Sequence, residues 1–171
     1  MRNLVERLID EKKKIATMES CTGGGVANAI TSIEGASEII GFSAVTYSND
    51  AKMMMGVSPK VIEEFSVYSR ECADEMSYNI ASFAGSNIGV GVTGKLNRVD
   101  VNNPYGDDNV VFISVYDRDN NSYYNSVVEA TLGSRSENKE LVISRVIEMV
   151  NAALSKSDDF KYDGGGKNFI K

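Results

Sequence analysis

One short stretch near the start of the chain constrains its fold more than any other. The apolar residues 15–18 are followed at once by Glu19-Ser20-Cys21-Thr22-Gly23-Gly24-Gly25. An apolar run that breaks into hydroxyl residues and glycines predicts a buried strand, a sharp turn and the beginning of a helix. Such a turn exposes several backbone N–H groups at one point, which predicts a site for an oxyanion or a phosphate.

The absence of histidine limits the chemistry of any hydrolytic site in this chain. A nucleophilic serine or cysteine cannot be paired with histidine here, so its base must be a lysine, a tyrosine or a carboxylate. The two cysteines, Cys21 and Cys72, lie in different predicted elements. We therefore expect neither a disulfide framework nor a structural zinc site, and we expect a cytoplasmic protein.

Length and charge narrow the class of protein further. A chain of 171 residues with 42% hydrophobic and 25% charged residues is typical of one soluble globular domain. The formal net charge of −6 argues against nucleic acid as a partner. No apolar run approaches the roughly 20 residues of a transmembrane helix, and acidic residues stand where a signal peptide would be hydrophobic. We expect no membrane partner, and a homo-oligomer is an open alternative.

The spacing of apolar residues predicts helices and strands that alternate along the chain. Strands are expected within residues 15–18, 39–48, 87–93, 110–116 and 122–131, the last two as a hairpin. Ser58 and Ser69 are predicted helix caps, Phe83 is predicted on a buried helix face, and a long helix follows Gly133. The pattern predicts a three-layer α/β/α sandwich with a mixed, mostly parallel central sheet, in which Ser20, Tyr47 and Thr93 fall at the carboxyl ends of strands.

Two segments are predicted to lie outside this regular pattern. Residues 94–108 are polar and irregular, and are predicted to form a long functional loop. Residues 1–156 are predicted to form the domain, and residues 157–171 a polar, glycine-rich C-terminal tail that is mobile.

Ser20 is the first candidate for a catalytic residue. A serine at a sharp strand-to-helix turn can act as a nucleophile, with nearby N–H groups stabilising a tetrahedral oxyanion. The alternative is that Ser20 or Thr22 is only a helix N-cap and the glycines are turn residues. Cys21 is a rival nucleophile that would depend on the helix dipole, or else a buried structural thiol.

Lys52 is the natural candidate for the base, with Tyr47 as a proton relay or as the group that orients the serine. A free lysine has a pKa of about 10.4, and burial or a nearby cation must lower it by roughly two to three units before it can accept a proton at neutral pH. The alternatives are a solvated helix lysine and a core tyrosine with its hydroxyl at the surface. Spacing alone does not place either residue beside Ser20.

The motifs of this chain resemble those of a known family. Residues 15–24, read as IATMESCTGG, are similar to the signature of the CinA C-terminal domain, the nicotinamide-nucleotide amidase family. The sequence GFSAVTYSNDAK of residues 41–52 resembles its second motif, and VGVTG of residues 90–94 its third. Ser69 matches the family's helix start, and Gly133-Ser134-Arg135 resembles its late Gly-x-Arg. The resemblance covers roughly residues 1–155 in one register.

This resemblance implies an α/β/α domain that hydrolyses the carboxamide of nicotinamide mononucleotide to nicotinate mononucleotide and ammonia, without a metal. It implies that Ser20 is the nucleophile, Lys52 the base and Tyr47 its hydroxyl partner. The residues that it assigns to binding of this small-molecule nucleotide substrate are Thr22, Gly23, Gly24, Thr93, Gly94, Arg135 and Lys139. Arg135 and Lys139 would approach the phosphate, and Arg135 could equally be a surface cation at a helix start.

One segment departs from the family pattern. After Gly94 the family has a glycine- and proline-rich loop, whereas this chain reads Lys95-Leu96-Asn97-Arg98-Val99-Asp100. Lys95 and Arg98 could supply phosphate contacts instead or be surface charges. Three functions therefore stay open: an amidohydrolase with a Ser-Lys-Tyr site, a module that binds the nucleotide or phosphate without turnover, and a protein-interaction domain in competence or DNA-damage physiology.

Overall fold

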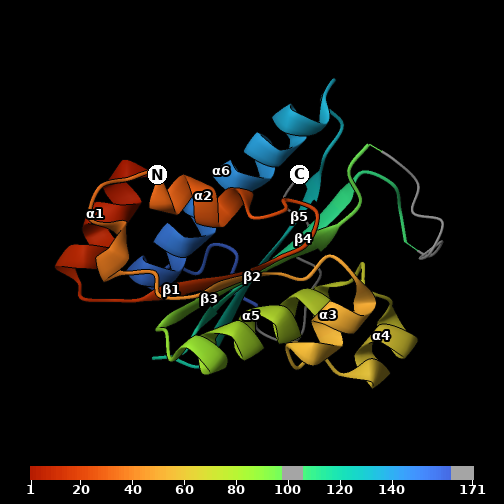
Figure 1. Ribbon diagram of the computed structural model, residues 1–171, viewed down its shortest axis with the longest axis horizontal. Coiled ribbons are helices and arrows are strands. Elements are labelled where there is room, and N and C mark those ends of the chain that lie inside the picture. Colours follow the sequence, from red (N-terminus) through yellow and green to blue (C-terminus); the bar gives the residue numbers. More distant parts are fainter. Residues whose placement is uncertain (98–105, 163–171) are drawn as a thin grey trace.

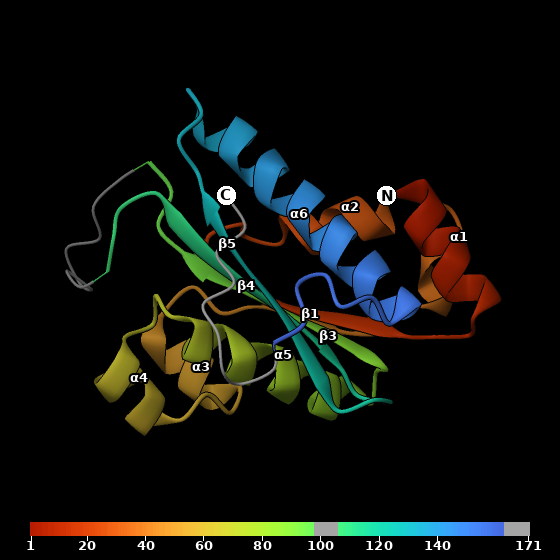
Figure 2. The same ribbon diagram turned by 180° about the vertical axis from the view of Figure 1, so that it is seen from behind.

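The computed structural model describes residues 1–97 and 106–162, which form a central sheet with helices on both faces. Figure 1 shows α1, α2 and α6 on one face and α3, α4 and α5 on the other, and Figure 2 shows the same two layers from behind. In chain order the elements are α1 (Arg2–Asp10), β1 (Ile15–Glu19), α2 (Gly25–Thr31), the 3₁₀ turn η1 (Ala36–Glu38), β2 (Ser43–Val45), α3 (Asn49–Met54), α4 (Pro59–Phe65), α5 (Arg70–Ala84), β3 (Ile88–Gly94), β4 (Val110–Asp117), β5 (Ser122–Glu129) and α6 (Arg135–Ser155). The three-layer α/β/α prediction is confirmed.

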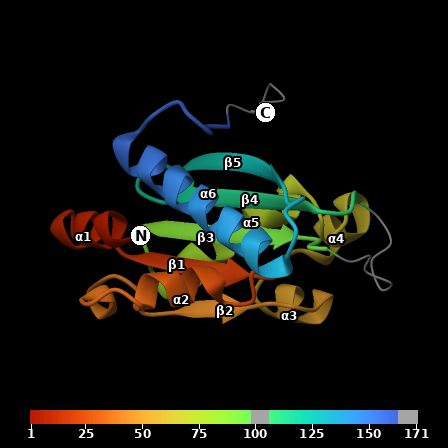
Figure 3. The same cartoon turned by 90° about the horizontal axis from the view of Figure 1, so that it is seen from above.

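The sheet has five strands in the order β2-β1-β3-β4-β5 (Figure 3). β1 pairs in parallel with both β2 and β3, whereas β4 pairs antiparallel with β3 and β5. The sheet is mixed as predicted, but "mostly parallel" overstates it, because only the β2-β1-β3 half is parallel. The three carboxyl ends of this half lie at one edge of the fold, where ligands bind in such sheets.

Several predicted elements are confirmed by their caps. The hydroxyl of Ser69 accepts a hydrogen bond from the N–H of Cys72 (3.1 Å) at the start of α5, and Ser58 caps α4 ahead of Pro59. The last helix begins with a capping box between Ser134 and Glu137. Polar side chains satisfy the first N–H groups of these helices, so the start positions could be predicted from the sequence.

Three predicted features differ in the structure. The strand predicted over residues 39–48 is only Ser43–Val45, because Ile39 ends η1 and packs into the core cluster that includes residues of α1. Phe83, predicted to be buried, is exposed on α5 and contacts the ring of Phe42 (centroids 4.8 Å apart). The predicted tail does not begin at residue 157: Lys161 bridges Tyr124 of β5, and residues 163–171 lie outside the described residues.

Apolar packing on both faces of the sheet positions the strand ends. One cluster joins α1, α2 and α6 to the sheet, and the other joins α5 and the segment around α4 to β1. No helix in the described ranges is both long and apolar enough to cross a membrane.

Candidate active site

Ser20 follows directly on β1 and is fixed by the strand beside it. Its N–H donates to the carbonyl of Val92 in β3 (2.9 Å), and its own carbonyl accepts from the N–H of Gly23 (2.9 Å). The chain therefore turns sharply just after Ser20, and Gly23 and Gly24 adopt left-handed φ values of 64° and 88°. Glycine adopts these angles without steric cost, so the turn can be tight.

Lys52 reaches Ser20 from α3, the helix that follows β2 along the chain. Its Nζ lies 3.2 Å from Oγ of Ser20 and donates to the carbonyl of Thr46 (2.9 Å). Lys52 is only 2% exposed and Ser20 only 6%. Lys52 is therefore not a solvated helix lysine, and burial disfavours the charged ammonium relative to the neutral amine that a base must be.

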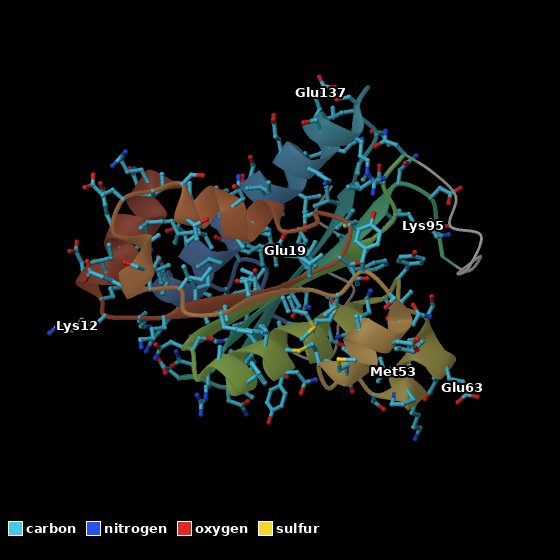
Figure 4. The ribbon with its side chains drawn as sticks, in the orientation of Figure 1. Lys12, Glu19, Met53, Glu63, Lys95 and Glu137 are labelled. Atoms are coloured by element: carbon cyan, nitrogen blue, oxygen red, sulfur yellow. The ribbon has the colours of Figure 1, made fainter. Side chains whose placement is uncertain are left out.

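Glu19, which sequence reasoning did not select, organises the turn after Ser20. Its carboxylate is fully buried and accepts hydrogen bonds from the N–H groups of Val26 (3.0 Å) and Ala27 (2.8 Å) in the first turn of α2. Figure 4 shows Glu19 between the sheet and α2, whereas Glu63 projects outward from α4. Neither the Ser20 nor the Thr22 side chain caps α2, so the prediction of a hydroxyl cap is wrong, whereas the glycines are turn residues as that alternative expected. The Glu19 carboxylate, from the preceding strand, binds the first N–H groups instead.

The same contacts limit the predicted anion site. Two of the first N–H groups of α2 already bind the Glu19 carboxylate, so a ligand cannot use them. The N–H of Thr22 donates to no acceptor in the described part of the chain, and the N–H of Cys21 interacts only with its own thiol. These two amides, in the turn itself, are the ones that can face an oxyanion beside Ser20.

Glu19 gives the first testable prediction. Replacing it with glutamine removes a charge-assisted acceptor from two buried amides and lowers the free energy of unfolding by about 2 kcal/mol. Chemical denaturation measures this, with Glu63→Gln as the matched control, because Glu63 is exposed and its substitution leaves stability unchanged. Equal stability of Glu19→Gln and wild type would show that the carboxylate does not hold this turn.

Cys21 is a buried thiol rather than a nucleophile. It is 3% exposed, and burial raises its pKa from 9.0 to about 12, against the lowering effect of the charges on Arg135 and Lys52. Burial likewise raises the pKa of the Cys72 thiol to about 12. Neither cysteine has the low pKa that a reactive thiol requires, and the two are not bonded to each other.

Tyr47 contacts a different partner from the one predicted. It is 63% exposed, so it is not a core aromatic, and its hydroxyl accepts a hydrogen bond from the guanidinium of Arg135 (3.0 Å). Arg135 also donates to the carbonyl of Leu96, so it links the ends of β2 and β3 to the start of α6. The role of Tyr47 beside Lys52 stays a prediction.

The residues predicted to bind substrate surround the same turn. Gly23 is exposed, and a Cβ built on it would lie 3.4 Å from Nζ of Lys139, so α6 places this lysine over the turn. Thr22 is 1% exposed, and its hydroxyl has no hydrogen-bond partner in the described ranges. The roles of Arg135, Lys139, Thr22, Gly23 and Gly24 in binding stay predictions.

Thr93 and Gly94 make structural contacts. The hydroxyl of Thr93 is buried and donates to the carbonyl of Val67 (2.7 Å), and Gly94 packs so closely that a Cβ would overlap Val110 and Val111 of β4. Lys95 is neither a surface charge nor free to reach a phosphate: it is 3% exposed and donates to the carbonyl of Gly106 (2.9 Å). Arg98 lies outside the described residues.

The fold and the site define an α/β domain with a buried serine–lysine pair at the carboxyl end of its parallel strands. Residues 1–154 match the CinA C-terminal domain family. The chain belongs to that family.

Individual relatives agree with this assignment. A Clostridium perfringens protein, provisionally named a competence-damage inducible protein, is 48% identical over 88 residues, which cover 51% of this chain and 21% of that protein. A CinA-like protein of Desulfosudis oleivorans is 40% identical over 88 residues, with the same shares. The chain thus matches about a fifth of the length of these relatives. The crystal structure of the competence/damage inducible protein CihA from Agrobacterium tumefaciens is 28% identical, with a TM-score of 0.78 over 90% of this chain and 94% of that one.

Proposed function

We propose that this domain is an amidohydrolase that converts nicotinamide mononucleotide to nicotinate mononucleotide and ammonia. The observation that carries the proposal is the 3.2 Å separation of the Lys52 amine from the Ser20 hydroxyl, with both side chains buried. In a protein without histidine, a neutral lysine amine at hydrogen-bond distance is a group that can take the proton of a nucleophilic serine. The family resemblance supplies the substrate.

The proposed reaction proceeds in two halves. Oγ of Ser20 gives its proton to Lys52 and forms a bond to the carboxamide carbon, and the oxygen of the tetrahedral intermediate faces the amides of Cys21 and Thr22. The carbon–nitrogen bond then breaks, Lys52 returns the proton to the nitrogen, and ammonia leaves. In the second half water gives a proton to Lys52, attacks the acyl carbon and releases the carboxylate, and Ser20 regains its proton.

The charges near the turn suit the proposed substrate. Lys139 lies over Gly23, and Arg135 lies at the first position of α6 next to Tyr47. Two cations on one side of the turn can bind a phosphate while the carboxamide lies at Ser20. The pyridinium ring withdraws electrons from its carboxamide, so a modestly activated serine is sufficient. Its positive charge also disfavours the protonated form of a neighbouring lysine.

A second candidate function is a module that binds the nucleotide or a phosphate without turnover. It is favoured by two observations. Tyr47 is hydrogen-bonded to Arg135, and Lys95 donates a hydrogen bond to the carbonyl of Gly106 instead of facing a ligand, in the segment that departs from the family pattern. In this case the Ser20–Lys52 pair would be present without productive chemistry.

Measurement of ammonia release separates the two functions. The purified chain is incubated with nicotinamide mononucleotide, and ammonia and nicotinate mononucleotide are quantified across neutral pH. We expect release by the wild type and none by Ser20→Ala, with the circular dichroism spectrum unchanged. Binding of the nucleotide by calorimetry without any ammonia from the wild type would establish the second function and exclude the first.

A further inference from the structure

A buried hydroxyl beside the Ser20–Lys52 pair has no role in the reaction as described so far. Thr46 is 2% exposed, and its Oγ1 is one of three buried side-chain polar atoms without a hydrogen-bond partner in the described ranges. A buried hydroxyl without a partner is unfavourable for folding alone, so it points to a ligand atom that completes it. The other two such atoms are Oγ1 of Thr22 and Oδ1 of Asn125.

The strand register places Thr46 next to Ser20. Glu19 pairs with Val45, and the N–H of Thr46 donates to the carbonyl of Glu19 (2.8 Å), so Thr46 and Ser20 are neighbours one position beyond the paired strands. Adjacent parallel strands are about 4.8 Å apart, so these two residues are side by side.

The alternation of side chains places the two hydroxyls on the same face of the sheet. Glu19 points to α2, where it binds two amides, and Val45 also points there, because its Cγ2 lies 3.4 Å from a Cβ built on Gly24. Successive side chains of a strand point to opposite faces, so Ser20 and Thr46 both point to the opposite face, from which Lys52 arrives.

Thr46 is also the residue that holds the base. Its carbonyl accepts the hydrogen bond from Nζ of Lys52 (2.9 Å). The hydroxyl therefore belongs to the same residue that binds the amine. Thr93, the hydroxyl residue on the other neighbouring strand, donates its proton to Val67 and is already occupied. Thr22 lies in the turn before α2, where a Cβ built on Gly25 would be 3.8 Å from its Cβ. Of these residues, only Thr46 has both an unpartnered hydroxyl and a carbonyl that binds the Lys52 amine.

We propose that the hydroxyl of Thr46 is the leaving-group subsite of the amidase reaction. This inference rests on the proposed function. In the bound carboxamide, Oγ1 of Thr46 accepts a hydrogen bond from an N–H of the nitrogen that will leave. It thereby holds this nitrogen beside Lys52, which returns to it the proton taken from Ser20 as the carbon–nitrogen bond breaks. Ammonia then leaves, and the acyl group stays on Oγ of Ser20.

Because the Thr46 hydroxyl acts as an acceptor, the leaving group of the substrate must donate a hydrogen bond to it. A carboxamide nitrogen carries hydrogens that it can donate to Thr46, whereas the leaving oxygen of an ester carries none. The hydroxyl therefore favours acylation by the amide over acylation by the ester of the same acid.

The test compares Thr46→Val, which keeps the shape and removes the hydroxyl, with Thr46→Ser, which retains the hydroxyl. The substrates are nicotinamide mononucleotide and the methyl ester of nicotinate mononucleotide, and kcat/KM is measured because it reports the steps through acylation. We expect Thr46→Val to lower kcat/KM about tenfold for the amide, with a much smaller change for the ester, and Thr46→Ser to restore most of the amide rate. Since the hydroxyl has no partner in the protein, the thermal midpoint of Thr46→Val is not lowered.

Other results overturn the inference. Amide hydrolysis by Thr46→Val at the wild-type rate would do so, as would equal losses for amide and ester, which indicate a structural role. A wild-type chain that releases product from neither substrate overturns the proposed function and this inference with it. The two failures are distinguishable, because only in that case is the wild type itself inactive.

Discussion

Replacement of Lys52 by methionine is expected to lower kcat/KM for ammonia release from nicotinamide mononucleotide by at least about 10³-fold. Methionine has a similar length but no group that can accept the proton of Ser20. Replacement by arginine should be equally damaging, because a guanidinium stays protonated and cannot act as a base. Steady-state kinetics on the two variants and the wild type measure both losses.

Two controls separate loss of the base from loss of the site. Lys60 lies exposed on α4, so Lys60→Met should retain full activity. Calorimetry should show that Lys52→Met still binds the nucleotide, because the cations Arg135 and Lys139 are unchanged. A Lys52→Met variant that hydrolyses the amide at the wild-type rate would contradict the proposed mechanism. In that case the 3.2 Å contact with Ser20 would be a structural hydrogen bond only.

Much of the fold could be predicted from the sequence because its signals are local. Ser58 before Pro59, Ser69 before α5 and the hairpin between β4 and β5 are each encoded within a few residues. The predictions that were wrong concern residues whose structure is determined by tertiary packing rather than by the local sequence. The apolar residues before β2 read as strand, but Ile39 ends a turn and joins the core cluster that includes α1. Phe83 is exposed and contacts only the ring of Phe42, which the helical spacing of α5 does not reveal.

Individual residues of the site could be predicted from the sequence, but their arrangement in space could not. Ser20 and Lys52 could be chosen from their residue types and motifs, whereas their contact spans 32 residues and depends on β2 pairing in parallel with β1. Thr46 was missed because its importance comes from the register and from an unpartnered hydroxyl, neither of which is visible in the sequence. Glu19 did have a signal: an acidic residue at the end of an apolar strand, immediately before a glycine-rich helix start, is a candidate cap for that helix.

Replacement of Gly91 by alanine is expected to lower the free energy of unfolding by about 3 kcal/mol or more, the largest stability effect that we predict. Gly91 lies in the middle of β3, where α5 packs directly against the strand. A Cβ at this position would overlap the carbonyl oxygen of Ala73 and lie 2.8 Å from the backbone nitrogen of Ser77. These are backbone atoms of a helix, so they cannot rotate away as a side chain would. The whole of α5 must shift, and its contacts with the sheet are lost.

The consequence reaches the site, because β3 also carries the carbonyl of Val92 that binds the N–H of Ser20 (2.9 Å). We therefore expect Gly91→Ala to lose activity together with stability. Thermal denaturation should show a midpoint lower by about 6 to 12 °C for a domain of this size. Gly41→Ala is the matched control, since no atom lies within 4 Å of its Cβ and its φ is not positive, and its midpoint should equal that of the wild type. If Gly91→Ala and Gly41→Ala unfold at the same temperature, the close packing of α5 on β3 is not what holds the strand ends in place.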